Sequence, residues 1–185
     1  MKHYKGKLST KKLVALALFT AFAFIFSFWS FPIFPATPYL KLDFGNVFIM
    51  LSGFLFGPIE AIAVTLVKEL LALTNTTSGG VGEIANFLMT SAFVLLPSII
   101  YKYRKGIKTV ALSLCGACFI GTAVSALVNR FIIFPLYMGG AAAAVFNSVF
   151  WFVIGFNILK TVSISILTVL LYKRLSRFLT KFEVK

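Results

Sequence analysis

Residues 13–34 read LVALALFTAFAFIFSFWSFPIF, a stretch of 22 residues without a charged side chain. A helix needs about 20 mainly apolar residues to cross the hydrocarbon core of a bilayer. The apolar core of a signal peptide is shorter, about 7–15 residues, and a small-x-small cleavage site follows it. No such site follows residue 34. We therefore expect residues 13–34 to form a retained transmembrane helix.

The composition of all 185 residues agrees with a membrane location. Apolar residues make up 59% of the chain and charged residues 12%, whereas soluble proteins contain about 45–50% and about 25%. These values exclude a soluble globule, a disordered tail and a disulfide scaffold. At this length we expect a single domain that spans residues 1–185.

Most basic residues gather at three places, although the formal net charge is +13. They lie at the N-terminus, in one central loop and at the C-terminus: Lys2, Lys5, Lys7, Lys11, Lys12; Lys102, Arg104, Lys105, Lys108; Lys173, Arg174, Arg177, Lys181 and Lys185. These clusters flank apolar runs, as the positive-inside rule describes for cytoplasmic segments. We therefore assign them to membrane orientation and to anionic headgroups, not to a nucleic-acid partner.

Five further apolar runs follow the first one. They cover residues 44–56, 59–73, 83–101, 109–137 and 141–172. Gly57-Pro58 separates the first two of these runs, which favours a helical hairpin over one long tilted helix. Six spans place both termini on the same side. The sequence thus predicts an all-α integral membrane protein with six transmembrane helices and with both termini cytoplasmic (N-in/C-in).

Lys160 is the most informative ionisable residue inside a span, because such groups are costly in a membrane and are often functional. It lies about 13 residues, or roughly 20 Å, from the inner end of the last run. Asn157 lies three residues earlier on the same helix face. An ammonium group and an amide there suit a ligand with carbonyl and ring-nitrogen acceptors. The alternative is a contact between helices with no ligand.

Two further asparagines are expected at a similar depth. Asn86 and Asn129 belong to the fourth and fifth spans, each near its outer end. A single asparagine in a membrane helix commonly joins helices. Three at one depth, together with a lysine, indicate a pocket for a polar heterocycle. Glu83 lies three residues before Asn86, near the outer end of the fourth span. Arg130 is expected to face a headgroup or to pair with a carboxylate such as Glu83.

Other polar residues in the spans are assigned structural roles. Lys68 and Glu69 are neighbours about 100° apart on a helix, so we expect them not to face one partner but to anchor the outer end of the third helix. Cys115 and Cys118 have C-x-x-C spacing without a second pair. We interpret them as small buried thiols rather than as a redox or zinc pair.

Motifs for catalysis are missing from the sequence. It contains neither G-x-x-x-x-G-K-[ST] nor H-E-x-x-H, and its only histidine, His3, precedes the first span. Nothing titratable is placed to activate a serine or threonine nucleophile. We therefore expect a protein that is not an enzyme.

Five segments together resemble the substrate-binding S components of energy-coupling factor (ECF) vitamin transporters, and within them the riboflavin-specific branch. They are LKLDF at 40–44, GFLFGP at 53–58, GEIANFL at 82–88, NRFIIFP at 129–135 and FNILK at 156–160. Their order over six spans carries the resemblance, which covers essentially the whole chain. It implies an S-component-like bundle without enzymatic activity, cofactor or metal, in the plasma membrane of a prokaryote.

The resemblance also implies a ligand, partners and site residues. The ligand is riboflavin, with FMN as a second candidate, and the partners are a transmembrane coupling subunit and two ATPases. Asn129, Asn157 and Lys160 are implied to hold the polar edge of the flavin. Leu40, Asp43, Asn86 and Phe87 are implied to enclose the ring and ribityl chain, and Glu83 is a further substrate-binding candidate. Ala17-x-x-x-Ala21 resembles the first-helix motif that docks to the coupling subunit, since small residues let helices approach closely.

Three alternatives remain at this level. The first is an S component for another vitamin such as thiamin, folate or biotin. The second is a stand-alone small-molecule carrier. A membrane-embedded enzyme is the third alternative, and it would need an activated nucleophile or metal site that the sequence does not offer.

Overall fold

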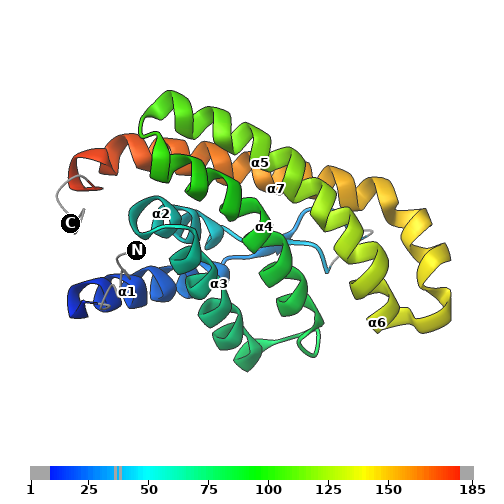
Figure 1. Cartoon of the computed structure of the whole chain (residues 1–185). Coiled ribbons are helices and arrows are strands. Elements are labelled where there is room, and N and C mark those ends of the chain that lie inside the picture. The colour runs from blue at the N-terminus through cyan, green and yellow to red at the C-terminus, as the bar shows by residue number, and fades with distance from the viewer. Residues whose placement is uncertain (1–8, 36, 38, 180–185) are drawn as a thin grey trace, which may run out of the picture.

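The computed structural model describes residues 9–35, 37 and 39–179, with residues 173–179 described only as helical backbone. These residues form an all-α bundle with one short two-stranded ribbon (Figure 1). The main helices are α1 (Thr10–Ser27), α2 (Asn46–Phe56), α3 (Pro58–Ala72), α4 (Val81–Tyr103), α5 (Ile107–Val128), α6 (Phe134–Met138) and α7 (Ala142–Leu179). Short 3-10 turns, η1 (Leu73–Asn75) and η3 (Gly139–Ala141), and a π-helix, η2 (Asn129–Ile133), complete the order.

The first helix ends earlier than the sequence predicts. Helix α1 begins after Ser9, whose side chain accepts a hydrogen bond from the Lys12 amide, and it ends at Ser27. The prediction of a helix up to residue 34 is therefore wrong. Residues Phe31–Pro32 instead form strand β1, which pairs antiparallel with β2 (Lys41–Leu42). Pro32 and Pro35 have no amide hydrogen to donate, so a helix cannot continue with full hydrogen bonding through them.

The expected break between the second and third runs is confirmed. Gly57 has a φ of 113°, a conformation that a residue with a side chain rarely adopts, and Pro58 occupies the first turn of α3. The two helices contact each other on either side of this break. With 11 and 15 residues, they are only about 16 and 22 Å long, so each is shorter than the hydrocarbon core of a bilayer.

The fifth predicted run is a composite rod in which α5, η2 and α6 follow one another without a loop. The fourth run is α4, which continues through Pro97, and the last run is α7. Within the described part of the chain, three segments are long and apolar enough by themselves to cross a membrane: Thr10–Ser27, Val81–Tyr103 and Ile107–Tyr172.

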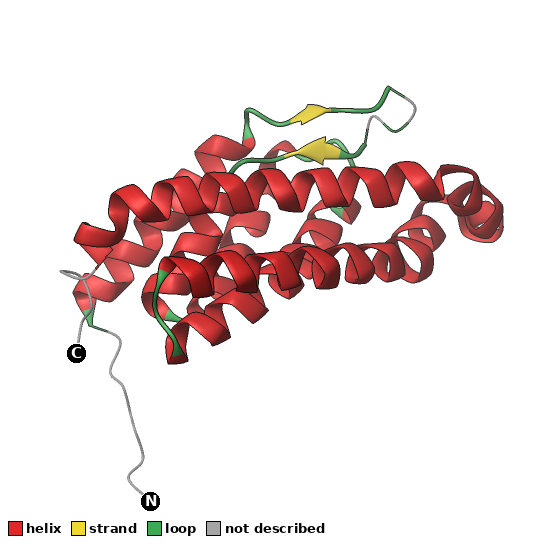
Figure 2. Cartoon of the chain, turned by 90° about the horizontal axis from the view of Figure 1, so that it is seen from above, coloured by secondary structure: helices red, strands yellow, loops and turns green. Residues whose placement is uncertain are grey.

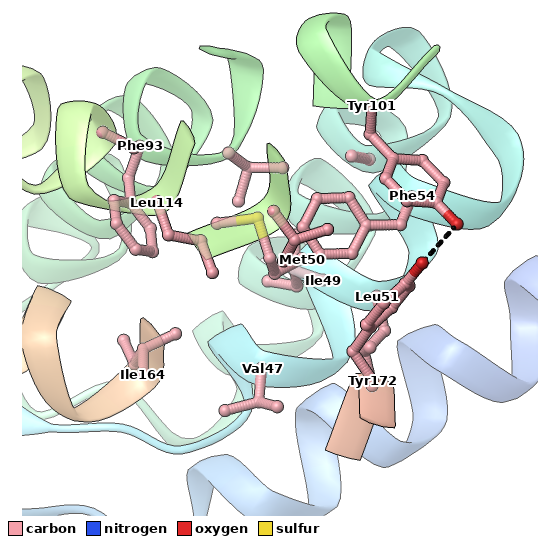
Figure 3. Close-up of a cluster of buried hydrophobic side chains, with 14 of the residues drawn as sticks. Val47, Ile49, Met50, Leu51, Phe54, Phe93, Tyr101, Leu114, Ile164 and Tyr172 are labelled. Atoms are coloured by element: carbon pink, nitrogen blue, oxygen red, sulfur yellow. Dashed lines mark hydrogen bonds between the residues drawn. The ribbon is translucent and has the colours of Figure 1, made fainter. Parts of the chain in front are cut away.

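Helix α2 occupies the centre of the bundle and contacts α1, α3, α4 and α7. Its side chains Ile49, Met50 and Leu51 are almost completely buried (Figure 3). Beside them, the Tyr101 and Tyr172 hydroxyls lie 3.1 Å apart. This central packing explains how a helix of only three turns becomes the core of the molecule.

The outer surface carries large apolar side chains. Leu112, Phe119 and Trp151 are more than 70% exposed, and such exposure over many helices suits a lipid environment rather than water. Cys115 is also exposed, while Cys118 is partly buried with its Sγ 3.5 Å from Ser165 Oγ. The expectation that both thiols are buried is therefore wrong for Cys115, because its helix face points away from the bundle.

The two ends of the bundle differ in what they hold. Figure 1 places the start of α1, the end of α7 and the α4–α5 turn at one end, and the α3–α4 loop and α6 at the other. Arg104 and Lys105 are exposed in the α4–α5 turn. Five basic residues of the predicted terminal clusters lie outside the described residues: Lys2, Lys5, Lys7, Lys181 and Lys185. The start of α1 and the end of α7 thus lie at the same end of the bundle, while the number of membrane crossings stays a prediction.

Candidate ligand-binding site

A cavity of about 510 Å³ lies between the ribbon, α3, α4, the η2–α6 segment and α7. The ribbon runs along one side of the helices (Figure 2). Strand β2 and the residues next to it contribute Tyr39, Leu40, Lys41 and Asp43 to the cavity wall. Residues of the α3–α4 loop and of α6 also line the cavity, which places it toward that end of the bundle. Its volume is in the range of small-molecule sites, about 300–1,000 Å³.

Lys160 and Asn86 form the polar contact across the cavity between α7 and α4. The Lys160 Nζ donates a hydrogen bond to Asn86 Oδ1 at 3.0 Å and lies 6.0 Å from the centre of the Phe156 ring. Lys160 is only 5% exposed. Its other two amine hydrogens have no partner recorded among the described residues, so this ammonium group retains the capacity to bind an acceptor on a ligand.

The π-helix positions Asn129 in the same cavity. Its wide turn, in which the Phe134 amide donates to the Asn129 carbonyl, brings Asn129, Ile133, Phe134 and Tyr137 to the cavity wall. The side-chain amide of Asn129 donates a hydrogen bond to the Ser125 carbonyl at 2.9 Å. Single π turns occur often at functional sites, because they change the direction of side chains within an otherwise regular helix.

A buried ionic cluster forms the wall on the α3 side. The Lys68 Nζ lies 2.7 Å from Asp43 Oδ2 and 2.8 Å from Glu69 Oε1. Lys68 is 1% exposed and Glu69 is 4% exposed. The expectation that Lys68 and Glu69 only anchor the end of a helix is therefore wrong: both line the cavity. The long lysine side chain overcomes the 100° offset, so it reaches its neighbour and the ribbon together.

Hydroxyl groups of the α3–α4 loop surround Glu83 at the rim. The Glu83 Oε2 accepts hydrogen bonds from Thr76 Oγ1 at 3.0 Å and from Ser78 Oγ at 2.9 Å. Tyr137 of α6 donates to the Ser78 carbonyl at 3.2 Å. Arg130 does not form an ion pair with Glu83; its guanidinium group donates a hydrogen bond to the Ala143 carbonyl at 3.0 Å. Burial raises the pKa of the Tyr39 hydroxyl, so Tyr39 is neutral in this wall.

Most residues that the sequence analysis singled out meet in this cavity. Leu40, Asp43, Glu83, Asn86, Asn129 and Lys160 all line it. Two others do not. Asn157 lines a second cavity of about 20 Å³ behind Lys160 and donates to the Val153 carbonyl at 2.8 Å. Phe87 is partly buried elsewhere on α4. A ligand-binding role for these residues stays a prediction.

Several residues of the cavity wall were not predicted from the sequence. Aromatic and sulfur side chains from α4, α6 and α7, namely Met89, Phe134 and Phe156, supply apolar walls beside Lys160. In a chain with 22 phenylalanines, nothing in the sequence distinguishes these from the lipid-facing ones. Asn46 was also missed; it is buried in the second cavity, and its Oδ1 has no hydrogen-bond partner among the described residues.

The charges of the large cavity balance formally, with Lys41, Lys68 and Lys160 against Asp43, Glu69 and Glu83. The described part of the chain contains no group of three or more His, Cys, Asp or Glu residues that could hold a metal ion. Apolar walls with a few directed polar groups are typical of a binding site for a small organic molecule. Fold and site thus define a helical membrane protein with a cavity for a small organic ligand.

Comparisons with known proteins agree with that class and make it specific. Residues 11–172 match the family model of the ECF transporter, substrate-specific component. The chain is 38% identical over 176 residues to the riboflavin transporter RibU of Staphylococcus aureus strain TCH60, covering 92% of this chain and 93% of that protein. It is 28% identical over 178 residues to the riboflavin transporter FmnP of Bacillus subtilis strain 168, covering 91% and 93%.

A solved structure has the same fold. It is described as the S component of a bacterial ECF transporter, and it matches with a TM-score of 0.80 and 38% identity over 91% of this chain and 97% of that one. The chain belongs to the family of substrate-specific components of ECF transporters. It is accordingly a multi-pass protein of the cell membrane.

Proposed function

We propose that this chain is the riboflavin-binding subunit of an ECF-type ABC transporter. In this proposal it takes up the vitamin in the cavity near the extracellular face and releases it when associated with a transmembrane coupling subunit and two ATPases. The protein itself carries out no reaction. Six membrane crossings with both termini cytoplasmic belong to the same proposal.

One observation carries the ligand assignment. The cavity combines Lys160, Asn86 and Asn129 with the side chains of Met89, Phe134 and Phe156. A flavin ring has carbonyl and ring-nitrogen acceptors along one edge and broad apolar faces, so it needs both kinds of wall. Two relatives are named riboflavin transporters, which supports the choice of this heterocycle over other vitamins.

The partner assignment rests on family membership and on helix α1. Ala17 and Ala21 lie one turn apart on α1, and both are exposed. Small residues on an exposed face let a helix of another protein approach closely within a bilayer. We propose that this face docks to the coupling subunit.

Purification of the full chain in detergent tests the ligand. We expect a yellow protein whose visible absorption is that of a flavin, and we expect riboflavin to bind again after it has been removed. Thiamin, folate and biotin lack this visible band. A colourless protein that does not bind added riboflavin would contradict the proposal and would favour an S component for another vitamin.

Transport measurements separate an S component from a stand-alone carrier. In proteoliposomes, we expect uptake of riboflavin only when the coupling subunit, both ATPases and ATP are present. Uptake by the chain alone at the same rate would favour a carrier.

A further inference from the structure

Glu69 of α3 presents a buried carboxylate to which the proposed function assigns no task. Its Oε1 accepts a hydrogen bond from Lys68 Nζ at 2.8 Å. Its Oε2 is buried and has no hydrogen-bond partner among the residues that the structure describes. Glu69 lines the large cavity, and the terminal torsion of a glutamate is soft, so Oε2 can turn toward a ligand with little strain.

A buried carboxylate oxygen without a donor costs free energy, and a hydrogen bond from a bound ligand removes that cost. No donor of the described residues reaches Oε2, so the missing hydrogen bond has to come from a group inside the cavity. An amide or hydroxyl group on the ligand meets this requirement, whereas an acceptor does not.

The charge around Glu69 excludes one class of donor-bearing ligand. Asp43 and Glu69 share the single ammonium group of Lys68, so this wall carries one more negative charge than positive. The other two lysines of the cavity are Lys41, which is exposed on the ribbon, and Lys160, which contacts Asn86 on the α4 side. An anionic group placed against the α3 wall would therefore meet a like charge, which is unfavourable in a site of low dielectric constant.

The surroundings indicate which part of the ligand lies here. After Glu69, the lining residues along the chain are Ala72 and the polar residues Asn75, Thr77 and Ser78. Aromatic and sulfur side chains line the cavity from α4, α6 and α7, and Phe24 and Phe28 add aromatic surface at the end of α1. A hydroxylated chain suits the first wall, and an aromatic ring suits the second.

We propose that Glu69 is a specificity-determining residue that accepts a hydrogen bond from the hydroxylated chain of the ligand and disfavours a phosphate on that chain. The proposal rests on the proposed function and refines it, because it selects riboflavin over its phosphate ester FMN. Lys68 holds the carboxylate in place, and Oε2 is the oxygen that the ligand satisfies.

Three flavins test this assignment in the full-length protein, purified in detergent and freed of ligand, with flavin fluorescence quenching as the measurement. Riboflavin has the hydroxylated chain, lumiflavin has a methyl group in its place, and FMN has a phosphate at its end. In Glu69→Met we expect riboflavin affinity to fall roughly ten-fold, while lumiflavin affinity changes less than about two-fold. In Glu69→Gln we expect the preference for riboflavin over FMN to fall roughly ten-fold, because the repelling charge is gone.

Glu60→Gln is the matched control, since Glu60 lies on the same helix but pairs with Lys12 outside the cavity. It should leave all three affinities unchanged. Equal losses of riboflavin and lumiflavin in Glu69→Met would overturn the proposal, because the residue would then support the whole cavity. An unchanged preference between riboflavin and FMN in Glu69→Gln would also overturn it, and this variant keeps an acceptor for Lys68 if Glu69→Met does not fold. A wild-type protein that binds none of the three flavins would refute the proposed function, and with it this refinement.

Discussion

The two buried lysines of the cavity wall, Lys68 and Lys160, have different surroundings. Lys68 contacts two carboxylates at 2.7 and 2.8 Å, so its charge is neutralised within the protein. Lys160 contacts a neutral amide oxygen at 3.0 Å and the face of the Phe156 ring, and it forms no ion pair within the described residues. A buried charge without a counter-charge in contact is costly. We infer that Lys68 mainly stabilises the fold, while Lys160 is available to a ligand.

Replacement of Lys160 by methionine should weaken riboflavin binding about ten-fold to a hundred-fold. The change removes a charge-assisted hydrogen bond in a dry site, which contributes about 1.5–3 kcal/mol, and methionine keeps much of the apolar volume. Fluorescence titration of the purified variant measures the loss. Lys102→Met, on the exposed end of α4, is the control and should bind as the wild type does. Equal affinities in all three proteins would leave Lys160 with a structural role only.

Replacement of Lys68 by methionine should destabilise the protein by about 3–5 kcal/mol, because it leaves two carboxylates buried without their shared cation. The comparison is Lys12→Met, which removes the ion pair with Glu60 between α1 and α3. That pair is partly exposed, so its loss should cost about 0–1 kcal/mol. Thermal unfolding in detergent measures both variants. Similar unfolding temperatures for the two variants would contradict the distinction between a buried and a partly exposed pair.

At the scale of elements, α1 differs from the other long helices in how little of it the protein covers. Thr20 and Ala23 are its only buried residues among those described, and Leu13, Val14 and Leu18 are about half exposed. Its outward face combines these apolar side chains with Ala17 and Ala21. Such a face is available to lipid or to a partner helix.

Ala17→Trp or Ala21→Trp should abolish ATP-dependent uptake and co-purification with the coupling subunit, because a bulky side chain prevents close helix approach. Riboflavin binding should remain normal, since neither alanine lines the cavity. Ala123→Trp, on an exposed face of α5, controls for a tryptophan on the lipid-facing surface and should retain uptake. Loss of riboflavin binding with an intact complex would show that these alanines pack within the chain.

At the scale of the whole molecule, the cavity and the basic α4–α5 turn lie at opposite ends of the bundle. The α3–α4 loop, with Thr77 and Ser78, contributes to the cavity, while Arg104 and Lys105 mark the other end. Basic loops are typically cytoplasmic, so this polarity supports the proposed orientation, in which the cavity lies toward the outer face. A substrate-binding subunit for uptake needs that orientation.

Cysteine labelling in intact cells tests the orientation. A cysteine at Ser78 should react with a membrane-impermeant reagent added outside, and a cysteine at Lys105 should react only after the cells are opened. Cys115 is exposed on the surface of the protein, so Cys115→Ala and Cys118→Ala must be combined as the background. The reverse labelling pattern would overturn the proposed topology.

The sequence alone determined that the protein is a helical membrane protein, because apolar runs near 20 residues and flanking basic clusters report the environment directly. It also located the break at Gly57-Pro58, where backbone geometry depends on two adjacent residues. Lys160, Asn86 and Asn129 could be singled out because polar groups are rare in membrane helices, so each one is informative.

Only the tertiary structure decided which side chains meet. The ribbon pairing of Phe31 with Leu42 shortens α1, and no local pattern specifies such a pairing across ten intervening positions that include three prolines. Lys68 joins Asp43 from 25 residues away, while Asn157 turns to its own helix and away from the large cavity. Contact between distant residues depends on how whole helices pack, and side-chain reach then selects the partner. For this reason the residue types of the site could be predicted from the sequence. The ion pairs of Lys68 with Asp43 and Glu69, and the Glu69 Oε2 without a hydrogen-bond partner, became visible only in the folded protein.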